Sequence, residues 1–312
     1  MRQRLLWLLD QADAIVALGV AVVVGILGLL QVTSTALTSN AILVTLGVLA
    51  VSVLRDRTHR SNADAAFRDA LDQFAEGQRA AADLAAVKVL RDSAITDAHA
   101  QARRQTDRWL FRGGTGTYTR AVTLPDLVRT ARLERRAITI SLEILDPADA
   151  SACERYARFR RSVSEEPDGT GESWDTRRVH VESYATVLAA CFQQERFGLL
   201  SIQVGLCHSM STFRFDLSSS GIIITQDDAR RPALFIPRSS FLYDSYDTEI
   251  RTSIEQADRL PLEKARSVSL SDPPEPEEVI ALFAALRLPF VLPTDEIPRI
   301  IEKTLHARNP YA

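Results

Sequence analysis

Cysteine is scarce in this chain of 312 residues, and the three cysteines that occur are widely spaced. Cys153, Cys191 and Cys207 form no CxxC pair, and their number is odd. This arrangement argues against a disulfide framework and against a cysteine zinc site. We therefore expect reduced, mostly buried thiols, and we predict neither a metal ion nor a cofactor.

A surplus of positive charge is lacking as well. The chain has 37 lysine and arginine residues against 40 aspartate and glutamate residues, which gives a formal net charge of -3 at pH 7. Domains that bind nucleic acids carry an excess of basic residues on the binding surface. We therefore expect no direct binding to nucleic acids.

The common catalytic motifs are also missing. The chain contains neither the GxSxG of α/β-hydrolases nor the HExxH of zinc proteases. His208 lies close in sequence to Ser209, Ser211 and Asp216, but this spacing matches no familiar catalytic triad. The sequence favours a binding protein over an enzyme without deciding the question.

The most informative absence is that of charged residues between Ala14 and Leu54. These 41 uncharged positions are about twice the roughly 20 residues that one bilayer crossing requires. We predict a transmembrane hairpin over residues 1–56, with spans at about 14–32 and 36–54. Arginines flank the hairpin on both sides, at positions 2, 4, 55, 57 and 60. The positive-inside rule therefore places both chain ends in the cytoplasm, as in a multi-pass protein of the cell membrane.

An alanine-rich segment without proline follows the hairpin. Its single glycine and recurring apolar positions predict a long helix over residues 57–108. Phe67, Leu71 and Phe74 have the spacing of a coiled-coil seam. Two interpretations remain open: a stalk within a homo-oligomer, and a helix that folds back onto the rest of the chain.

The remaining chain has the pattern of an α/β domain. Strands are expected at residues 137–146, 199–207, 212–217, 221–226 and 232–238, and helices at 147–163, 176–198 and 246–260. This mixture indicates a mixed sheet with flanking helices over residues 109–262. A proline-rich linker and two short helices, at 277–286 and 296–305, are expected within residues 263–312.

The segment WLFRGGTGTYTR, residues 109–120, is the leading candidate for a ligand-binding loop. Its glycine amides can approach an anion, while the flanking side chains supply charge and a stacking face. It matches neither GxGxxG after a strand nor GxxxxGK[ST], because it lacks lysine and follows a predicted helix. The alternative is a tight entry into the domain, in which Arg112 pairs with an acid such as Asp126. The candidate residues of this segment are Arg112, Gly113, Gly114, Gly116, Tyr118 and Arg120.

Three further residues are candidates because of their places on predicted strands. Arg214 and Asp216 share one face of the strand at 212–217 and can line a pocket there. Asp146 follows the strand at 137–146, and ligand sites of α/β proteins form at the carboxyl ends of strands. We include all three in the predicted ligand-binding set.

Three runs of the sequence resemble an uncharacterised actinobacterial domain that is often joined to an N-terminal helix-turn-helix regulator. They are FRGGTGTYTRAVTLPDLVRTAR, ITISLEILDPADASACERYARFR and FRFDLSSSGIIITQDDARRPALFIPRSSFLYDS, and the resemblance covers about residues 109–260. The pattern also looks like a distant phospholipase D-like fold, although no histidine of the chain has a lysine two positions later. The resemblance implies a sensing or regulatory domain without phospholipase D chemistry.

Together these features suggest a membrane-anchored sensor or effector. Its cytosolic domain is expected to bind a nucleotide or another small phosphorylated molecule and to signal to the hairpin in the bilayer. Such an architecture resembles that of membrane effectors in bacterial nucleotide-signalled defence. The alternatives are a membrane-tethered protein-interaction module without a small ligand and, third, a phosphodiesterase-like hydrolase.

Overall fold

The computed structural model describes two separate parts of the chain. They belong to two compact units, Met1–Ala81 and Ala82–Ala312. The described residues are 86–104, 106–163, 170–228 and 230–311, together with 71–78 and the positions 19, 46, 47, 69 and 82. The predicted spans at 14–32 and 36–54 lie outside the described residues, except for positions 19, 46 and 47. Among the residues that are described, none forms a helix with the length and apolarity needed to cross a bilayer.

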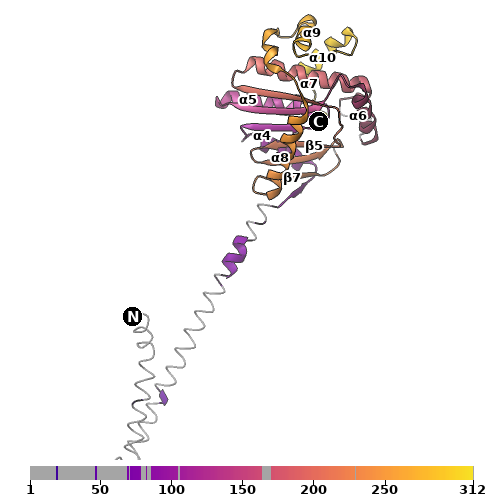
Figure 1. Ribbon diagram of the computed structural model, residues 1–312. Helices are drawn as coiled ribbons and strands as arrows, with labels where there is room; N and C mark the ends of the chain where they lie inside the picture. Colours follow the sequence, from indigo (N-terminus) through magenta and orange to yellow (C-terminus); the bar gives the residue numbers. More distant parts are fainter. Residues whose placement is uncertain are drawn as a thin grey trace, which may run out of the picture. The chain divides into compact units, whose positions relative to one another are not determined.

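The described part of the second unit contains an eight-stranded mixed sheet with the strand order β1-β7-β6-β5-β2-β3-β4-β8 (Figure 1). Parallel pairing joins β2 to β3 and β3 to β4, and the remaining neighbours are antiparallel. The mixed α/β class predicted from the sequence is therefore confirmed. The strands are Lys88–Leu90, Arg108–Arg112, Ile138–Leu145, Leu200–Cys207, Phe213–Ser218, Gly221–Gln226, Ala233–Pro237 and Asp258–Arg259.

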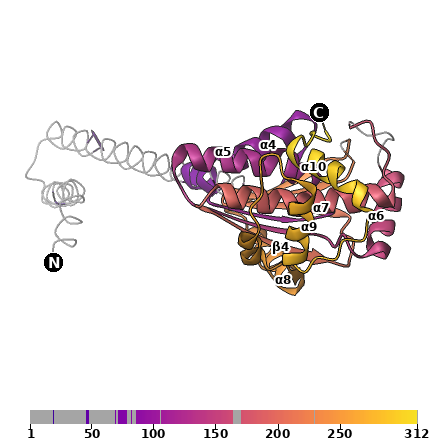
Figure 2. The same cartoon turned by 90° about the horizontal axis from the view of Figure 1, so that it is seen from above.

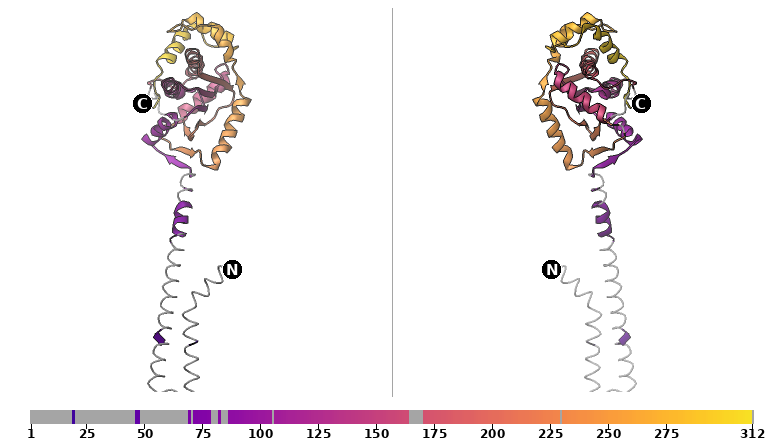
Figure 3. Two further views of the ribbon diagram at one scale, coloured as in Figure 1. Left: turned by 90° about the vertical axis from the view of Figure 1, so that its left-hand side faces the viewer. Right: turned by 90° about the vertical axis from the view of Figure 1, so that its right-hand side faces the viewer.

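Helices cover both faces of the sheet, because its central strands bury side chains on both sides. On β2, Trp109 and Phe111 belong to a core shared with helices α4, α5 and α7. The residue between them, Leu110, packs with Tyr243 and Ile250 of α8 on the opposite face. Figure 3 shows α8, drawn in orange, along one side of the sheet. These helices span Ser93–Arg104 (α4), Leu124–Glu134 (α5), Thr176–Arg196 (α7) and Phe241–Gln256 (α8).

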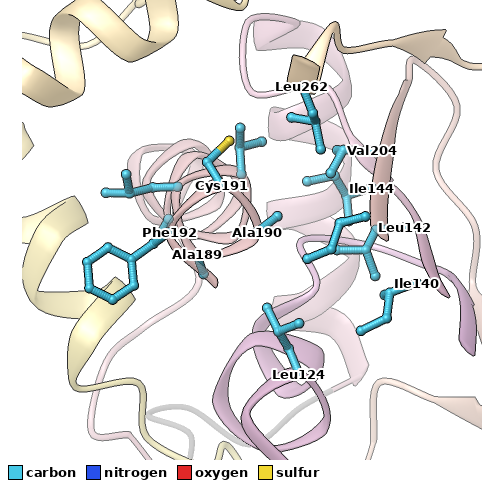
Figure 4. Packing of buried hydrophobic residues seen from close by; sticks show 14 of the residues in the cluster. Leu124, Ile140, Leu142, Ile144, Ala189, Ala190, Cys191, Phe192, Val204 and Leu262 are labelled. Carbon is cyan, nitrogen blue, oxygen red and sulfur yellow. The ribbon is translucent and has the colours of Figure 1, made fainter. Parts of the chain in front are cut away.

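Helix α7 is buried along most of its length, because a further layer of helices covers it. All fifteen residues from Arg178 to Phe192 are buried, as expected for a helix that is enclosed on all sides. Its inner side meets strand residues such as Leu142 and Val204 (Figure 4). Its outer side meets α10 (Ile297–Leu305), which lies beside it in Figure 2, and α9 (Pro276–Ala285) belongs to the same core.

Local signals explain where several helices begin. The side chain of Asp175 caps α7 by accepting a hydrogen bond from the Arg178 amide at 2.6 Å. A capping box between Glu275 and Glu278, with proline in the first turn, begins α9. Helix α6 (Ala150–Val163) follows the turn after β3, as the sequence predicted.

The single long helix predicted over residues 57–108 is wrong, although residues 71–78 and 93–104 are helical. Within that range the structure has strand β1, helix α4 and the first residue of β2, while residues 57–68 lie outside the described part. Strand β1 pairs with β7, more than 140 positions later. Pairing with a distant strand overrides the helical propensity of an alanine-rich segment, and the local sequence of the segment does not reveal it. The sheet domain therefore begins before residue 109.

The helix predicted at 246–260 is also shifted. Helix α8 begins earlier, where Ser240 caps it by accepting a hydrogen bond from the Leu242 amide. It ends at Gln256, and the next residues, Asp258–Arg259, form the edge strand β8. The prediction missed the serine cap, and the pairing of β8 with β4 ends the helix earlier than its periodicity suggests.

Candidate functional site

The glycine loop joins a strand to a helix, as phosphate-binding loops of α/β proteins do. Strand β2 ends at Arg112, helical residues begin at Thr117, and β3 returns parallel to β2. The expectation that a helix precedes the loop is therefore wrong, because β2 gains its pairing from β3 and β5. The loop consequently lies at the carboxyl edge of the parallel strands, where α/β domains form ligand sites.

The glycines of this loop have structural reasons to be glycine. Gly116 has a φ of +71°, which an L residue with a side chain adopts only at a cost. A Cβ on Gly114 would collide with the ring of Tyr156, and one on Gly113 would lie 2.8 Å from Cζ of Phe111. Packing and backbone conformation thus explain the glycines without a ligand. The space beside the loop is the feature that indicates a binding site.

That space is a cavity of about 350 Å³, a size within the range of small-molecule sites. Its floor consists of the loop residues Gly114 to Tyr118 and of Gln226, Asp227 and Asp228, which end β6 or follow it. Helix α4 lines it with Ile95, Thr96 and His99, helix α6 with Tyr156 and Arg160, and the end of the chain with Asn309, Pro310 and Tyr311. Segments from across the domain therefore converge on the glycine loop.

The buried Arg160 and the half-buried Arg214 bring two guanidinium groups to the cavity wall, which also contains Arg231 and four aspartates. Arg160 forms an ion pair with Asp227 at 2.6 Å, and Arg214 approaches the same carboxylate at 3.5 Å. The hydroxyl of Tyr156 donates a third interaction to Asp227 at 2.9 Å. The guanidinium of Arg160 also lies 4.3 Å from the ring centre of Trp174. The positions of both guanidinium groups are thus fixed before any ligand arrives.

His99 contributes a polar atom without a partner. The residue is 5% exposed, and its Nδ1 makes no hydrogen bond within the described structure. Burial, together with the charges of Arg214 and Arg103, lowers the pKa of His99 to about 3, so the imidazole is neutral at physiological pH. Buried polar atoms are usually paired. An unpaired imidazole nitrogen on a residue that lines a cavity is a group left for a ligand or a water molecule.

Asp216 is a second titratable group in the cavity wall. Its carboxylate accepts a hydrogen bond from Nε1 of Trp109 at 3.2 Å. Burial raises the pKa of Asp216 to about 6, against the opposing influence of Arg214 and of the tryptophan hydrogen bond. The charge of the cavity therefore changes close to neutral pH.

The structure gathers about half of the predicted ligand residues at this cavity. Gly114, Gly116, Tyr118, Arg214 and Asp216 line it, as described above. The other four predicted residues, Arg112, Gly113, Arg120 and Asp146, lie outside its lining.

Arg112 and Asp126 both have other partners than the sequence suggested. Arg112 reaches Glu143 and Glu249, each at 3.3 Å. Asp126 pairs with Arg103 at 2.8 Å, so the predicted pairing of Arg112 with Asp126 is wrong. Arg103 lies on α4, which packs against α5 and so reaches Asp126.

Arg120 is buried on the far side of the loop, away from the cavity. It pairs with the carboxylate of Glu182 and donates a hydrogen bond to the main-chain oxygen of the same residue at 2.7 Å. Lys303 reaches the other carboxylate oxygen of Glu182 at 2.8 Å. These two cations lower the pKa of Glu182 to about 2, despite its burial. Arg120 therefore ties the loop to α7 and α10.

His208 belongs to a separate cluster on the surface. Its Nδ1 lies 3.0 Å from Asp149 and 3.9 Å from Asp146, and its Nε2 lies 3.0 Å from Asp258. Hydrogen bonds to Asp258 and Asp149 raise the pKa of His208. Within the described chain no group of histidine, cysteine and acidic residues is arranged to hold a metal ion. The predicted site residue Asp146 thus lies in an ion cluster that joins the ends of β3 and β4 to β8.

Sequence reasoning missed most of the cavity wall. The missed residues include His99, Tyr156, Arg160, Trp174, Asp227 and Tyr311. They come from α4, α6, the entry to α7, the end of β6 and the last residues of the chain. One signal was present: Asp227 and Asp228 directly follow a strand that was correctly predicted. The other residues meet only through the tertiary fold.

Comparison with other proteins adds nothing to this geometry: no family model, no curated protein and no solved structure matches the chain.

Proposed function

We propose that this chain is a membrane-anchored sensor or effector, and that its α/β domain binds a small phosphorylated ligand in the cavity beside the glycine loop. One observation carries the proposal. The cavity combines the amino end of a helix, the arginines Arg160 and Arg214 and an unpaired buried imidazole in one space of about 350 Å³. No feature of the fold described above requires such a combination.

The loop can supply hydrogen-bond donors to a phosphate. Within the described structure, the amides of Thr115, Gly116 and Thr117 take part in no backbone hydrogen bond. They lie just before and at the start of the helical stretch that continues into α5, where free amides and the helix dipole favour an anion. Arg160 and Arg214 add charge, and arginine forms strong, oriented hydrogen bonds to phosphate oxygens.

The aromatic rings of the cavity wall indicate a second feature expected of the ligand, which is a planar group. Tyr118, Tyr156, Trp174 and Tyr311 all line the cavity, and such rings pack on planar groups. A nucleotide carries both a phosphate and a planar base. The cavity volume lies at the lower end of the range for small-molecule sites, which favours a ligand of about the size of a mononucleotide.

The polypeptide itself connects the cavity wall to the predicted hairpin. Asp92, Ser93, Ile95 and Thr96 line the cavity and form the start of α4. They directly follow β1, which the chain enters soon after the first unit ends at Ala81. A ligand that repositions α4 acts on the segment closest to the uncharged stretch at residues 14–54. The proposal makes that stretch the membrane anchor and the receiver of the signal.

A paired ligand panel tests the binding function. The full-length protein, purified in detergent, is heated with AMP, GMP, ribose 5-phosphate and cyclic dinucleotides, and with the dephosphorylated partners adenosine, guanosine and ribose. A ligand at a hundred times its dissociation constant adds about 2.7 kcal/mol to the stability of the native state. We expect at least one phosphorylated compound to raise Tm while its dephosphorylated partner does not.

Matched arginine variants assign the effect to the cavity. Arg231 lines the cavity and is exposed, whereas the exposed Arg251 lies on α8 and pairs with Asp247. Arg231→Gln should reduce the ligand-induced shift, Arg214→Gln should abolish it, and Arg251→Gln should leave it unchanged. Equal responses of Arg231→Gln and Arg251→Gln would place the ligand elsewhere. A panel without any effect favours the alternative of a protein-interaction module.

A further inference from the structure

The segment Asn309–Tyr311 forms part of the wall of the candidate site. The ring of Tyr311 lies 5.7 Å from the ring centre of Tyr118, and the guanidinium of Arg214 lies 4.9 Å from the centre of the Tyr311 ring. The segment follows helix α10, which ends at Leu305. The helix that precedes the segment packs on α7.

The hydroxyl of Tyr311 contacts both arginines. Arg214 donates a hydrogen bond to it from Nη1, and Arg160 also hydrogen-bonds to it. Both arginines pair with the carboxylate of Asp227, Arg214 also donates hydrogen bonds to Thr225 and to the main-chain oxygen of Gln226, and Asp216 is a further carboxyl group of the cavity wall. At the hydroxyl of Tyr311, the two guanidinium groups thus meet a phenol oxygen and, among the described residues, no carboxylate.

A neutral hydroxyl is a weaker partner for two guanidinium groups than an oxyanion. A hydrogen bond from arginine to a hydroxyl already has a charged donor, and an oxyanion in the same place adds the attraction between opposite charges. The tyrosine hydroxyl therefore satisfies the donors without matching their charge. A phosphate or carboxylate oxygen placed at the same point would satisfy both.

We propose that an anionic group of the ligand takes the place of the Tyr311 hydroxyl between Arg160 and Arg214, so that residues 309–311 leave the cavity when the ligand binds. The segment is then a built-in competitor whose release reports that the site is occupied. The identity of the ligand rests on the function proposed above, whereas the anion position and the competition can be tested with a simple ion.

Competition lowers the apparent affinity of the site. If only a fraction of the molecules has the segment released, the apparent dissociation constant rises by the inverse of that fraction. Removing the Tyr311 side chain should remove this penalty. The positions of the Arg160 and Arg214 side chains should stay unchanged, since both pair with Asp227.

Inorganic phosphate is the probe for this test. Thermal unfolding of the full-length protein is followed against phosphate concentration for the wild type, Tyr311→Ala, Tyr311→Phe and Tyr246→Phe, at constant ionic strength. Tyr246 packs against Phe215, away from the cavity wall, and controls for the loss of a phenol hydroxyl. We expect Tyr311→Ala to reach its half-maximal Tm rise at a phosphate concentration about tenfold lower than the wild type. Tyr311→Phe should shift in the same direction, and Tyr246→Phe should match the wild type.

Hydrogen exchange supplies a second readout that depends on displacement. Amides of residues 306–311 should exchange faster in the wild type when phosphate is present. Slower exchange would mean that the segment closes over the anion, and this would overturn the proposal. Equal phosphate responses of Tyr311→Ala and the wild type, or no response of either, would overturn it too. If a phosphorylated compound of the panel still binds in that case, only the displacement of residues 309–311 is refuted. If phosphate gives the expected results but no compound of the panel binds, only the function proposed above is refuted.

Discussion

At the scale of single residues, the cavity is built from groups whose ordinary chemistry has been changed by burial. His99 is kept neutral and unpaired, while Arg160 and Arg214 remain charged beside one carboxylate. Asp216 titrates near pH 6. Residues with shifted pKa values cluster at functional sites, although structural ion pairs shift them as well. Substitution of Asp216 tests whether the charged form of this residue costs the fold stability, as expected at a functional site, or is stabilised by a structural ion pair.

Asp216→Asn should stabilise the protein above neutral pH. The pKa of Asp216 is raised from 3.8 to about 6, so the native state binds the proton more tightly than the unfolded state does. The wild type therefore loses stability as pH rises from about 4 to about 6, by up to about 3 kcal/mol. The variant avoids this loss, so its Tm should exceed that of the wild type at pH 8 and approach it at pH 4.

Asp228→Asn is the control for this pH series. The pKa of Asp228 is lowered, despite burial, through its interactions with Arg230 and Arg231. Its stabilising contribution is present above its unfolded pKa and is lost as pH falls, so this variant should be less stable than the wild type at pH 8. An Asp216→Asn protein that is also destabilised at pH 8 would show that the charged carboxylate is satisfied in the fold.

At the scale of elements, the domain depends on charged contacts that join the loop to two helices. Arg120 follows the glycine loop in the turn Thr119–Thr123, Glu182 lies on α7 and Lys303 on α10. Removing one partner of a buried ion pair leaves the other charge buried and uncompensated. The ion pair between Arg120 and Glu182 therefore holds the loop against α7, while residues 114–118 of the loop line the cavity.

Arg120→Ala should destabilise the domain by about 3–5 kcal/mol. Urea unfolding of the full-length protein measures this change, with Arg129→Ala as the control. Arg129 is exposed and pairs with Asp126 at the surface, so its loss should cost about 0.5 kcal/mol or less. A stable Arg120→Ala protein that no longer binds a ligand would restore Arg120 to the ligand contacts predicted from the sequence.

The elements also show what local sequence patterns can predict. Strands β3 to β7 and helices α6, α7, α9 and α10 were predicted within a few residues, because each carries its own periodicity and end signals. Strands β1, β2 and β8 were missed, and α4 was predicted only as part of one long helix. They are short or alanine-rich and gain their form from partners distant in sequence.

The candidate site follows the same division. The glycine loop and the Arg214–Asp216 strand could be chosen from the sequence, since residue type and spacing carry their chemistry. Arg120 has the same residue type as Arg214 but faces the opposite way, and nothing local distinguishes the two. His99, Arg160 and Tyr311 reach the cavity through packing of α4, α6 and the end of the chain, which no local pattern encodes.

At the scale of the whole molecule, the chain combines a sheet domain with a segment that the sequence predicts to enter a membrane. In the sheet, the parallel strands β2, β3 and β4 meet the antiparallel strands at β5. The cavity lies at this change of direction, where the carboxyl ends of β2 and β6 are close to the start of β5. Along the sequence, β1 and α4 are the first elements of the sheet domain after the first unit ends at Ala81.

The most direct test of the central claim is a calorimetric titration of the full-length protein. Each phosphorylated compound of the panel is titrated beside its dephosphorylated partner, with Arg231→Gln and Arg251→Gln as matched variants. The account predicts that one phosphorylated compound binds with one site per chain, that its partner binds at least about tenfold more weakly, and that only Arg231→Gln weakens the binding. Equal binding of a phosphorylated compound and its partner, or no binding of any compound to the folded protein, would contradict it.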